Sequence, residues 1–254
     1  MASIIDAFNE SLNENQAYVK IVLFAIPIYF VADLFLVGKM AQFTFWGAIL
    51  AVLVLGLLTQ GIHNVRLNRS EVLTLNPIDW VVALSKAIIV LTPQFLIFGS
   101  IGYFLTTKIT IPIDLPHVPM IYSVIVWSIV FSIILTSYLS FAKYLKVLQG
   151  FNYKVIFESC IDVLVSFLFF LPQLIFANVV LIGPVMYLFF VFNVPYTHWG
   201  FVAYCSAIGV INISILANYL AQSGYEQIKG NNEDYQDNCQ INVIDDAAER
   251  LNGH

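Results

Sequence analysis

The chain has 254 residues, of which 59% are hydrophobic and 11% are charged, and its mean hydropathy is +0.83. A soluble domain carries about 25% charged residues, so this composition excludes a water-soluble globule and indicates an integral membrane protein. The net charge of −5 arises after Tyr225, where seven acids face only Lys229 and Arg250. The other basic residues are scattered in twos and threes, which excludes a nucleic-acid surface.

Six apolar stretches predict an all-α integral membrane fold with six transmembrane helices. A hydrocarbon core of about 30 Å needs roughly 20 apolar residues in a helix. The stretches that meet this requirement are residues 18–38, 44–62, 84–105, 120–141, 161–192 and 198–220. The first 16 residues hold three acids and neither Lys nor Arg, so we do not expect a cleaved signal peptide there.

The fifth stretch is longer than one upright span. Residues 163–192 stay apolar for 30 residues, which corresponds to about 45 Å of straight helix. We expect Pro172 and the Gly183–Pro184 pair either to bend this helix or to leave a second short helix along the membrane interface.

The basic residues predict the orientation of the spans. With six spans, both termini lie on one side, and nine of the eleven Lys and Arg residues fall on that side. Only Lys39 and Lys108 fall on the other. The positive-inside rule therefore places both termini in the cytoplasm.

A proline recurs in the middle of every odd-numbered span, at Pro27, Pro93 and Pro172. Each of these spans follows an amphipathic segment, at residues 4–12, 76–86 and 151–164. We interpret this pattern as three tandem hairpins, each led by an interfacial amphipathic helix. Asn76 before Pro77 is a typical helix start. The prolines predict kinks, with the three odd spans packed around a shared axis.

Gln94 and Gln173 each follow one of these prolines, in the similar phrases TPQFLIF and LPQLIF. A proline frees a backbone carbonyl that needs a new partner in lipid. The structural interpretation is that both glutamines donate hydrogen bonds to neighbouring helices. The alternative is that the kinked spans are hinges around a central path.

The other polar residues in the spans also have either a structural or a functional interpretation. Asp33 lies near the outer face and Asp162 near the cytoplasmic face, so each is either interfacial or a contact for a substrate or partner. Asn212, near the middle of the sixth span, is the best single candidate for a buried polar contact. A four-residue hydroxyl stripe on the fourth span predicts a close-packing seam or a polar lining: Ser128, Ser132, Thr136 and Ser140.

Motifs for catalysis, cofactors and metals are absent from the sequence. His63, His117 and His198 stand alone, and the three cysteines have no spacing typical of zinc or disulfides. The sequence contains no GxSxG, P-loop or dinucleotide-binding motif. We therefore expect a protein that is not an enzyme and binds neither cofactor nor metal.

The chain divides into a membrane domain, residues 1–225, and an acidic cytoplasmic tail, residues 226–254. The tail begins with a polar linker. Four apolar residues near its end share one helical face: Ile241, Ile244, Ala248 and Leu251. This segment is either a docking helix for a protein partner or frayed, because twelve residues are marginal for an isolated helix.

The juncture GIHNVRLNRSEVLTLNPIDWVVALSKA, from Gly61 to Ala87, resembles that of a family of multi-span prokaryotic membrane proteins known as domain of unknown function number 4013. Gly61, the basic residues after it and the Leu75–Trp80 segment carry the resemblance, which covers the chain to about Tyr225. It implies a six-span protein of the bacterial or archaeal cytoplasmic (inner) membrane and assigns no catalytic residues.

Two functions are compatible with these features. The first is a non-enzymatic membrane scaffold or accessory subunit that binds lipid or protein partners. The second is a small permease for a neutral or amphipathic solute, with Gln94, Gln173 and Asn212 as polar contacts. The sequence does not indicate an oligomeric state.

Overall fold

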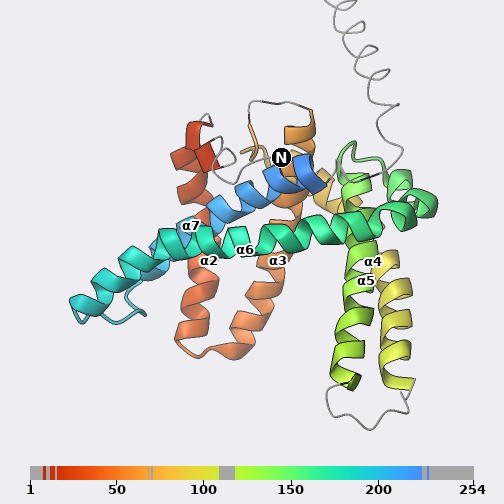
Figure 1. Ribbon diagram of the computed structural model, residues 1–254. Coiled ribbons are helices and arrows are strands. Elements are labelled where there is room, and N and C mark those ends of the chain that lie inside the picture. Colours follow the sequence, from red (N-terminus) through yellow and green to blue (C-terminus); the bar gives the residue numbers. More distant parts are fainter. Residues whose placement is uncertain are drawn as a thin grey trace, which may run out of the picture.

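The computed structural model describes residues 8–9, 12–14, 16–67, 69, 71–108, 118–224 and 228. Its elements are helical throughout this part of the chain (Figure 1). The α-helices are α2 (Ala17–Leu36), α3 (Met40–Arg66), α4 (Pro77–Lys108), α5 (Val118–Ala142), α6 (Tyr153–Val191) and α7 (Trp199–Tyr219). A 3₁₀-helix, η1 (Val147–Phe151), precedes α6, and a π-helix, η2 (Leu220–Gly224), follows α7.

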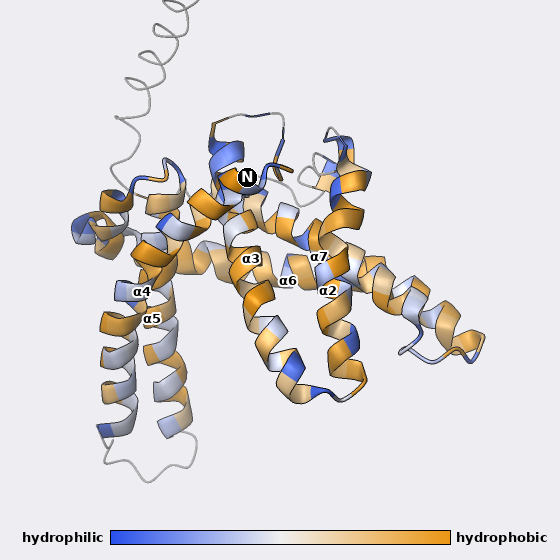
Figure 2. Cartoon of the chain, turned by 180° about the vertical axis from the view of Figure 1, so that it is seen from behind, coloured by the Kyte–Doolittle hydropathy of each residue, from blue (hydrophilic) through white to orange (hydrophobic). Residues whose placement is uncertain are grey.

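The six α-helices are long and apolar enough to cross a membrane. They coincide with the six predicted stretches, and hydrophobic residues recur along the length of each helix (Figure 2). The protein is therefore an all-helical chain of the multi-pass membrane type. The tail and most of the first amphipathic segment lie outside the described residues, so those two predictions have no structural counterpart.

The second and third amphipathic segments are not separate elements. Residues 77–86 are the first turns of α4, and residues 153–164 are the first turns of α6. The predicted helix start is confirmed, because Asn76 Oδ1 accepts a hydrogen bond from the backbone N–H of Ile78 at 3.1 Å. The Asn76 amide also donates to Asp79 at 3.1 Å, which orients the cap.

α2, α4 and α6 continue through their prolines. Of the two alternatives for the fifth span, the second short helix is wrong, because α6 is one helix of 39 residues that includes both Pro172 and Pro184. Proline removes only one backbone donor, and neighbouring turns keep their hydrogen bonds. At 1.5 Å per residue α6 is about 58 Å long, roughly twice the hydrocarbon thickness.

The three hairpins are not equivalent. α2–α3 and α4–α5 extend in the same direction, with the α2–α3 turn and the end of α4 at the same end of the molecule (Figure 1). At that turn Gly38 has a φ of 76°, a conformation that glycine adopts without strain. α6 instead runs across both hairpins (Figure 1), so it is strongly inclined to the four helices of these hairpins.

The second, fourth and sixth spans, which are α3, α5 and α7, lie at the centre of the packing. α3 contacts α2, α4, α5 and α7, whereas α2 packs on α3 and α7, and α6 packs on α5 and α7. The prediction that the proline-bearing helices share an axis is therefore wrong. Small residues on α3 allow the close approach: a Cβ added to Gly61 would lie 2.8 Å from Ala217 Cβ, and one on Gly56 would lie 3.0 Å from Trp80 O.

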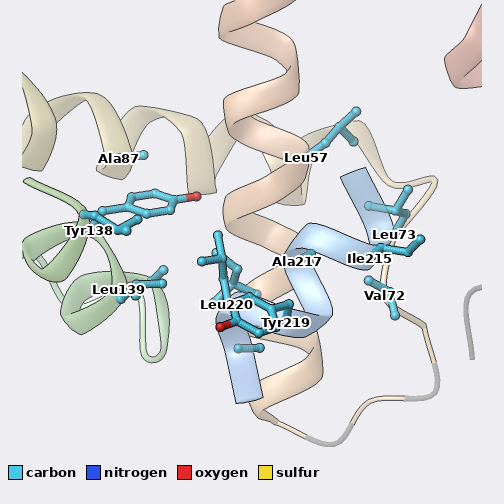
Figure 3. Close-up of a cluster of buried hydrophobic side chains, with 14 of the residues drawn as sticks. Leu57, Val72, Leu73, Ala87, Tyr138, Leu139, Ile215, Ala217, Tyr219 and Leu220 are labelled. Atoms are coloured by element: carbon cyan, nitrogen blue, oxygen red, sulfur yellow. The ribbon is translucent and has the colours of Figure 1, made fainter. Parts of the chain in front are cut away.

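The hydrophobic core lies where α3, α5 and α7 meet near their C-terminal ends (Figure 3). Ile62, Leu139 and Ile215 are each 1% exposed there. Ile228, beyond η2, is also buried in this core. The first half of α3 and most of α6 are outside it, and their apolar side chains are exposed to the surroundings, as they are in helices that face lipid.

Candidate functional site

Buried polar side chains gather at the end of the molecule where α3 and α5 finish and α2 begins. We call this region the polar end and define it by Glu14, Lys20, Thr59, Gln60, His63, Asn64, Arg66 and Lys143. Lys20 is 2% exposed and Thr59 is fully buried. Buried polar groups are costly unless they are hydrogen-bonded, so the partners of each group indicate what the region does.

Lys20 joins three segments of the chain. Its Nζ lies 3.0 Å from Glu14 Oε1 and 3.0 Å from Glu71 Oε2. Glu14 Oε1 also accepts a hydrogen bond from the backbone N–H of Leu73 at 3.0 Å. The residues before α2, the first turn of α2 and the α3–α4 loop are therefore fastened around one ammonium group.

Burial raises the pKa of the Glu14 carboxyl above its ordinary value, and the hydrogen bond and positive charge of Lys20 oppose that rise. The side chains of Glu14 and Lys20 are each 3% exposed, whereas that of Glu71 is 38% exposed. Glu71 therefore remains in contact with water, whereas Glu14 depends on Lys20 and on the backbone N–H groups of Leu73 and Val72.

Asn64 holds the α3–α4 loop against α3. Its Nδ2 donates to the carbonyl of Val72 at 3.2 Å. Its Oδ1 accepts from Gln60 Nε2 at 2.9 Å and from Arg69 Nη1 at 3.2 Å. The α3–α4 loop, which lies within the segment Gly61–Ala87 that carries the resemblance, is thus fixed to the last two turns of α3.

The end of α3 is also tied to α5 and η2. The hydroxyls of Thr59 and Tyr138 lie 2.8 Å apart. His63 Nδ1 lies 2.7 Å from the carbonyl oxygen of Lys143, and it carries the proton because a carbonyl only accepts. Arg66 Nη1 donates to the carbonyl of Ala221 at 2.8 Å. The polar end is a set of fastenings between α2, α3, α5 and η2.

The structure separates the predicted polar contacts. Gln94 is fully buried, and its Nε2 donates to the carbonyl of Gly150 in η1 at 3.0 Å. Ser137 of α5 donates to the same carbonyl at 2.6 Å. A Cβ on Gly150 would lie 2.5 Å from Val90, so the backbone of η1 comes close to α4. The Oε1 atom of Gln94 has no hydrogen-bond partner within the described ranges.

Gln173 has a different environment, although its local sequence matches that of Gln94. Its side chain is exposed on α6. Asn212 of α7 exchanges two hydrogen bonds with Asn178 of α6, at 2.8 and 3.2 Å. Asn212 was predicted to be a buried polar contact; it does bond to a neighbouring helix, but it is half-buried. The structure brings neither Gln94 nor Gln173 to it.

Asp33 is exposed near the end of α2, and Asp162 is half-buried in the third turn of α6. The hydroxyl stripe of α5 is a close-packing seam, because Ser132 donates to the carbonyl of Cys160 in α6 and Ser140 donates to that of Gln149 in η1 at 3.1 Å. Thr136 bonds within its own helix. The hydroxyls of Ser132 and Ser140 therefore join α5 to its neighbours.

A groove of about 760 Å³ opens along the second half of α6. Apolar side chains between Leu174 and Phe190 line it together with Tyr196, and Asn178 lies at one end. Within the part of the chain that the structure describes, no cluster of His, Cys, Asp and Glu could hold a metal ion. His198 caps α7, since its Nδ1 accepts from the N–H of Gly200 at 3.2 Å.

Sequence reasoning missed the polar end. Gln60 and Asn64 stand four residues apart on one helical face, and this spacing was the available signal. Lys20, Glu14 and Glu71 are separated by up to 57 residues, so no local pattern joins them.

No family model, no curated protein and no solved structure matches the chain. The resemblance to domain of unknown function number 4013 therefore stays a prediction from the sequence. Among the residues that carry it, Gly61 lies at the α3–α7 crossing, and the Trp80 ring packs edge-on against Phe24 with centroids 6.3 Å apart.

Proposed function

We propose that the protein is a non-enzymatic membrane scaffold or accessory subunit of a bacterial or archaeal cytoplasmic membrane, with both termini in the cytoplasm. The observation that carries this proposal is the use of the buried polar groups. At the polar end they bond to other segments of the same chain, through Lys20, Asn64, His63 and Arg66. A solute path needs polar groups that remain available to the solute.

The position of the fastenings supports a partner on the side of the termini. They hold the segment before α2, the α3–α4 loop and η2 in fixed relation. The tail, residues 226–254, follows η2 directly. In this proposal the rigid polar end orients the tail, and the tail and the membrane lipid are the contacts of the subunit.

A permease for a neutral or amphipathic solute is the second candidate, and two observations favour it. The groove along α6 has the volume of a small-molecule site. Gln94 also keeps one buried acceptor without a partner in the described chain. These two features lie on different helices, at α6 and at the α4–η1 contact, which is why the scaffold is preferred.

The two candidates are separated by one pair of variants. Gln94→Leu combined with Gln173→Leu removes both amides, and Lys39→Met serves as a control at an exposed residue. Purified wild type in proteoliposomes is expected to give no uptake of small neutral solutes above empty vesicles. Uptake by wild type that the double variant abolishes and Lys39→Met retains would overturn the scaffold proposal.

The scaffold proposal also predicts the side of the membrane. Single cysteines introduced at Arg69 and at Lys39 are exposed to an impermeant maleimide added to intact cells. Labelling is expected at position 39 and, only after cell lysis, at position 69. The reverse pattern would place the polar end and the tail outside the cell and would rule out a cytoplasmic partner.

A further inference from the structure

Positive charge gathers around His63, in the last turn of α3. The charges of Arg69, from the α3–α4 loop, and of Lys86, from α4, both act on the His63 ring. His63 Nδ1 lies 2.7 Å from the carbonyl oxygen of Lys143, the residue that follows α5. Three segments of the chain therefore bring cations to one place, and such a region attracts anions.

A further cation adjoins this region at the end of α5. Lys146 Nζ lies 5.6 Å from the centroid of the Tyr144 ring, and Lys143 Nζ lies 4.3 Å from the same centroid. Lys146 directly precedes η1. The backbone of η1 approaches α4 at Val90, one helical turn beyond Lys86. Lys146 and Lys86 therefore lie on either side of the same contact between η1 and α4.

Three of these cations are not used to pair with carboxylates, in contrast to Lys20. Within the described ranges no ion pair involves Arg69, Lys86 or Lys146. Arg69 is exposed, and its Nη1 donates to Asn64 Oδ1 at 3.2 Å, which fixes the position of the guanidinium group. We call Arg69, Lys86 and Lys146 the basic cluster. Like charges held close together repel each other, so an anion among them lowers the free energy of all three.

The apolar surface beside the basic cluster indicates which anion reaches it. Leu148 follows Lys146 by two residues and is 86% exposed, the largest fraction of any large apolar side chain that the structure describes. In a protein of the multi-pass membrane type, such a side chain is stable in hydrocarbon and costly in water. The Lys146 ammonium group instead requires water or lipid headgroups. The two residues therefore lie at the boundary between headgroups and acyl chains, where a lipid phosphate is within reach.

We propose that the basic cluster binds the phosphate of an anionic phospholipid in the leaflet on the side of the termini, with an acyl chain of that lipid against Leu148. This inference rests on the proposed function, in which membrane lipid is a contact of the subunit, and it names the class of lipid. Arg69 presents a planar fork to two phosphate oxygens, and Lys86 and Lys146 supply compact charges. Basic pockets between spans on the cytoplasmic side bind such headgroups. A zwitterionic headgroup is disfavoured, because the cluster repels its ammonium group.

The test titrates the detergent-purified full chain with phosphatidylglycerol or phosphatidylcholine and measures bound lipid by native mass spectrometry. Wild type is expected to prefer phosphatidylglycerol. Lys86→Gln combined with Lys146→Gln is expected to weaken its binding about thirtyfold, since each basic residue near anionic headgroups contributes about fivefold. Lys39→Gln combined with Lys108→Gln makes the same change of charge at exposed residues of the opposite ends of the two hairpins, and it is expected to leave binding unchanged.

Two further arms separate binding from folding and from capture of free phosphate. Arg69→Gln, a single change at an exposed residue, is expected to weaken phosphatidylglycerol binding about fivefold and to leave urea unfolding without lipid unchanged. Excess inorganic phosphate is expected not to displace the lipid, because it has no acyl chain.

Equal binding of the two lipids by wild type, equal losses in the two double variants, or displacement by inorganic phosphate would overturn the inference. Solute uptake by a wild type that still prefers phosphatidylglycerol would contradict only the scaffold proposal.

Discussion

The polar end and the middle of α6 use polar side chains in opposite ways. At the polar end, Lys20 and Asn64 are almost fully buried and each is bonded to two or more groups of the same chain. In the middle of α6, Gln173 is exposed among large apolar side chains. The comparison indicates that the buried polar groups of the polar end stabilise the fold, whereas the exposed amide of Gln173 contributes little to it.

Breaking the polar end at Lys20 should have the largest effect. Lys20→Met leaves the Glu14 carboxyl buried with only the backbone N–H groups of Leu73 and Val72 beside it, and removing one member of a buried ion pair costs about 3–5 kcal/mol. We expect a loss near the lower value, about 3 kcal/mol, because Glu71 is partly solvated. Urea unfolding in detergent micelles measures it. Lys39→Met is the matched control, and equal losses for the two variants would contradict the structure.

The α3–α7 crossing provides the next test. Gly61→Ala places a methyl group 2.8 Å from Ala217 Cβ, and neither group can rotate away, so the helices must separate. Overpacking of this kind costs about 1–3 kcal/mol. Gly99→Ala is the control, because a Cβ there meets nothing within 4 Å, and it should be neutral or slightly stabilising. The same unfolding assay would contradict the crossing if both variants were neutral.

The two glutamines differ in the effect expected when the amide is removed. Gln94→Leu removes the hydrogen bond to Gly150 and should lower the free energy of unfolding by about 1 kcal/mol. Gln173→Leu should leave the free energy of unfolding unchanged, because the Gln173 side chain is exposed. Urea unfolding in detergent measures both effects, and equal losses in the two variants would mean that Gln173 has an internal partner.

The smallest expected effect is the pH dependence at Glu14. Its folded pKa is raised, so between the unfolded value near 4.5 and the folded value the native state binds more protons than the unfolded state. The contribution of Glu14 to the free energy of unfolding is therefore fully present below the unfolded pKa and is lost as pH rises through the folded pKa. The melting temperature of wild type relative to Glu14→Gln should rise as pH falls from neutrality towards 4.5. A constant or falling difference would contradict the raised pKa.

Local features of the sequence predicted the elements well and the contacts less well. The six spans follow from hydropathy and length, and the start of α4 follows from the Asn76–Pro77 pair, since both depend on neighbours in the chain. The hydroxyl stripe of α5 was predicted to be either a close-packing seam or a polar lining, and its contacts with Cys160 and Gln149 agree with the seam. The prediction that the amphipathic segments at 76–86 and 151–164 are separate helices was wrong, because nothing in the sequence ends a helix between each segment and the span that follows it.

Sequence alone determined that this protein is helical and of the membrane-spanning type, because its apolar runs exceed the thickness of a bilayer and lipid leaves backbone groups no partner outside a helix. Only the tertiary structure shows that two segments of similar sequence make different contacts. Gln94 and Gln173 both follow a proline, but η1 covers Gln94 whereas no described segment covers Gln173. Whether a side chain is buried and paired depends on which distant segments of the chain pack against it. Lys20, which is paired with Glu71 although 51 positions separate them in the sequence, is the clearest example.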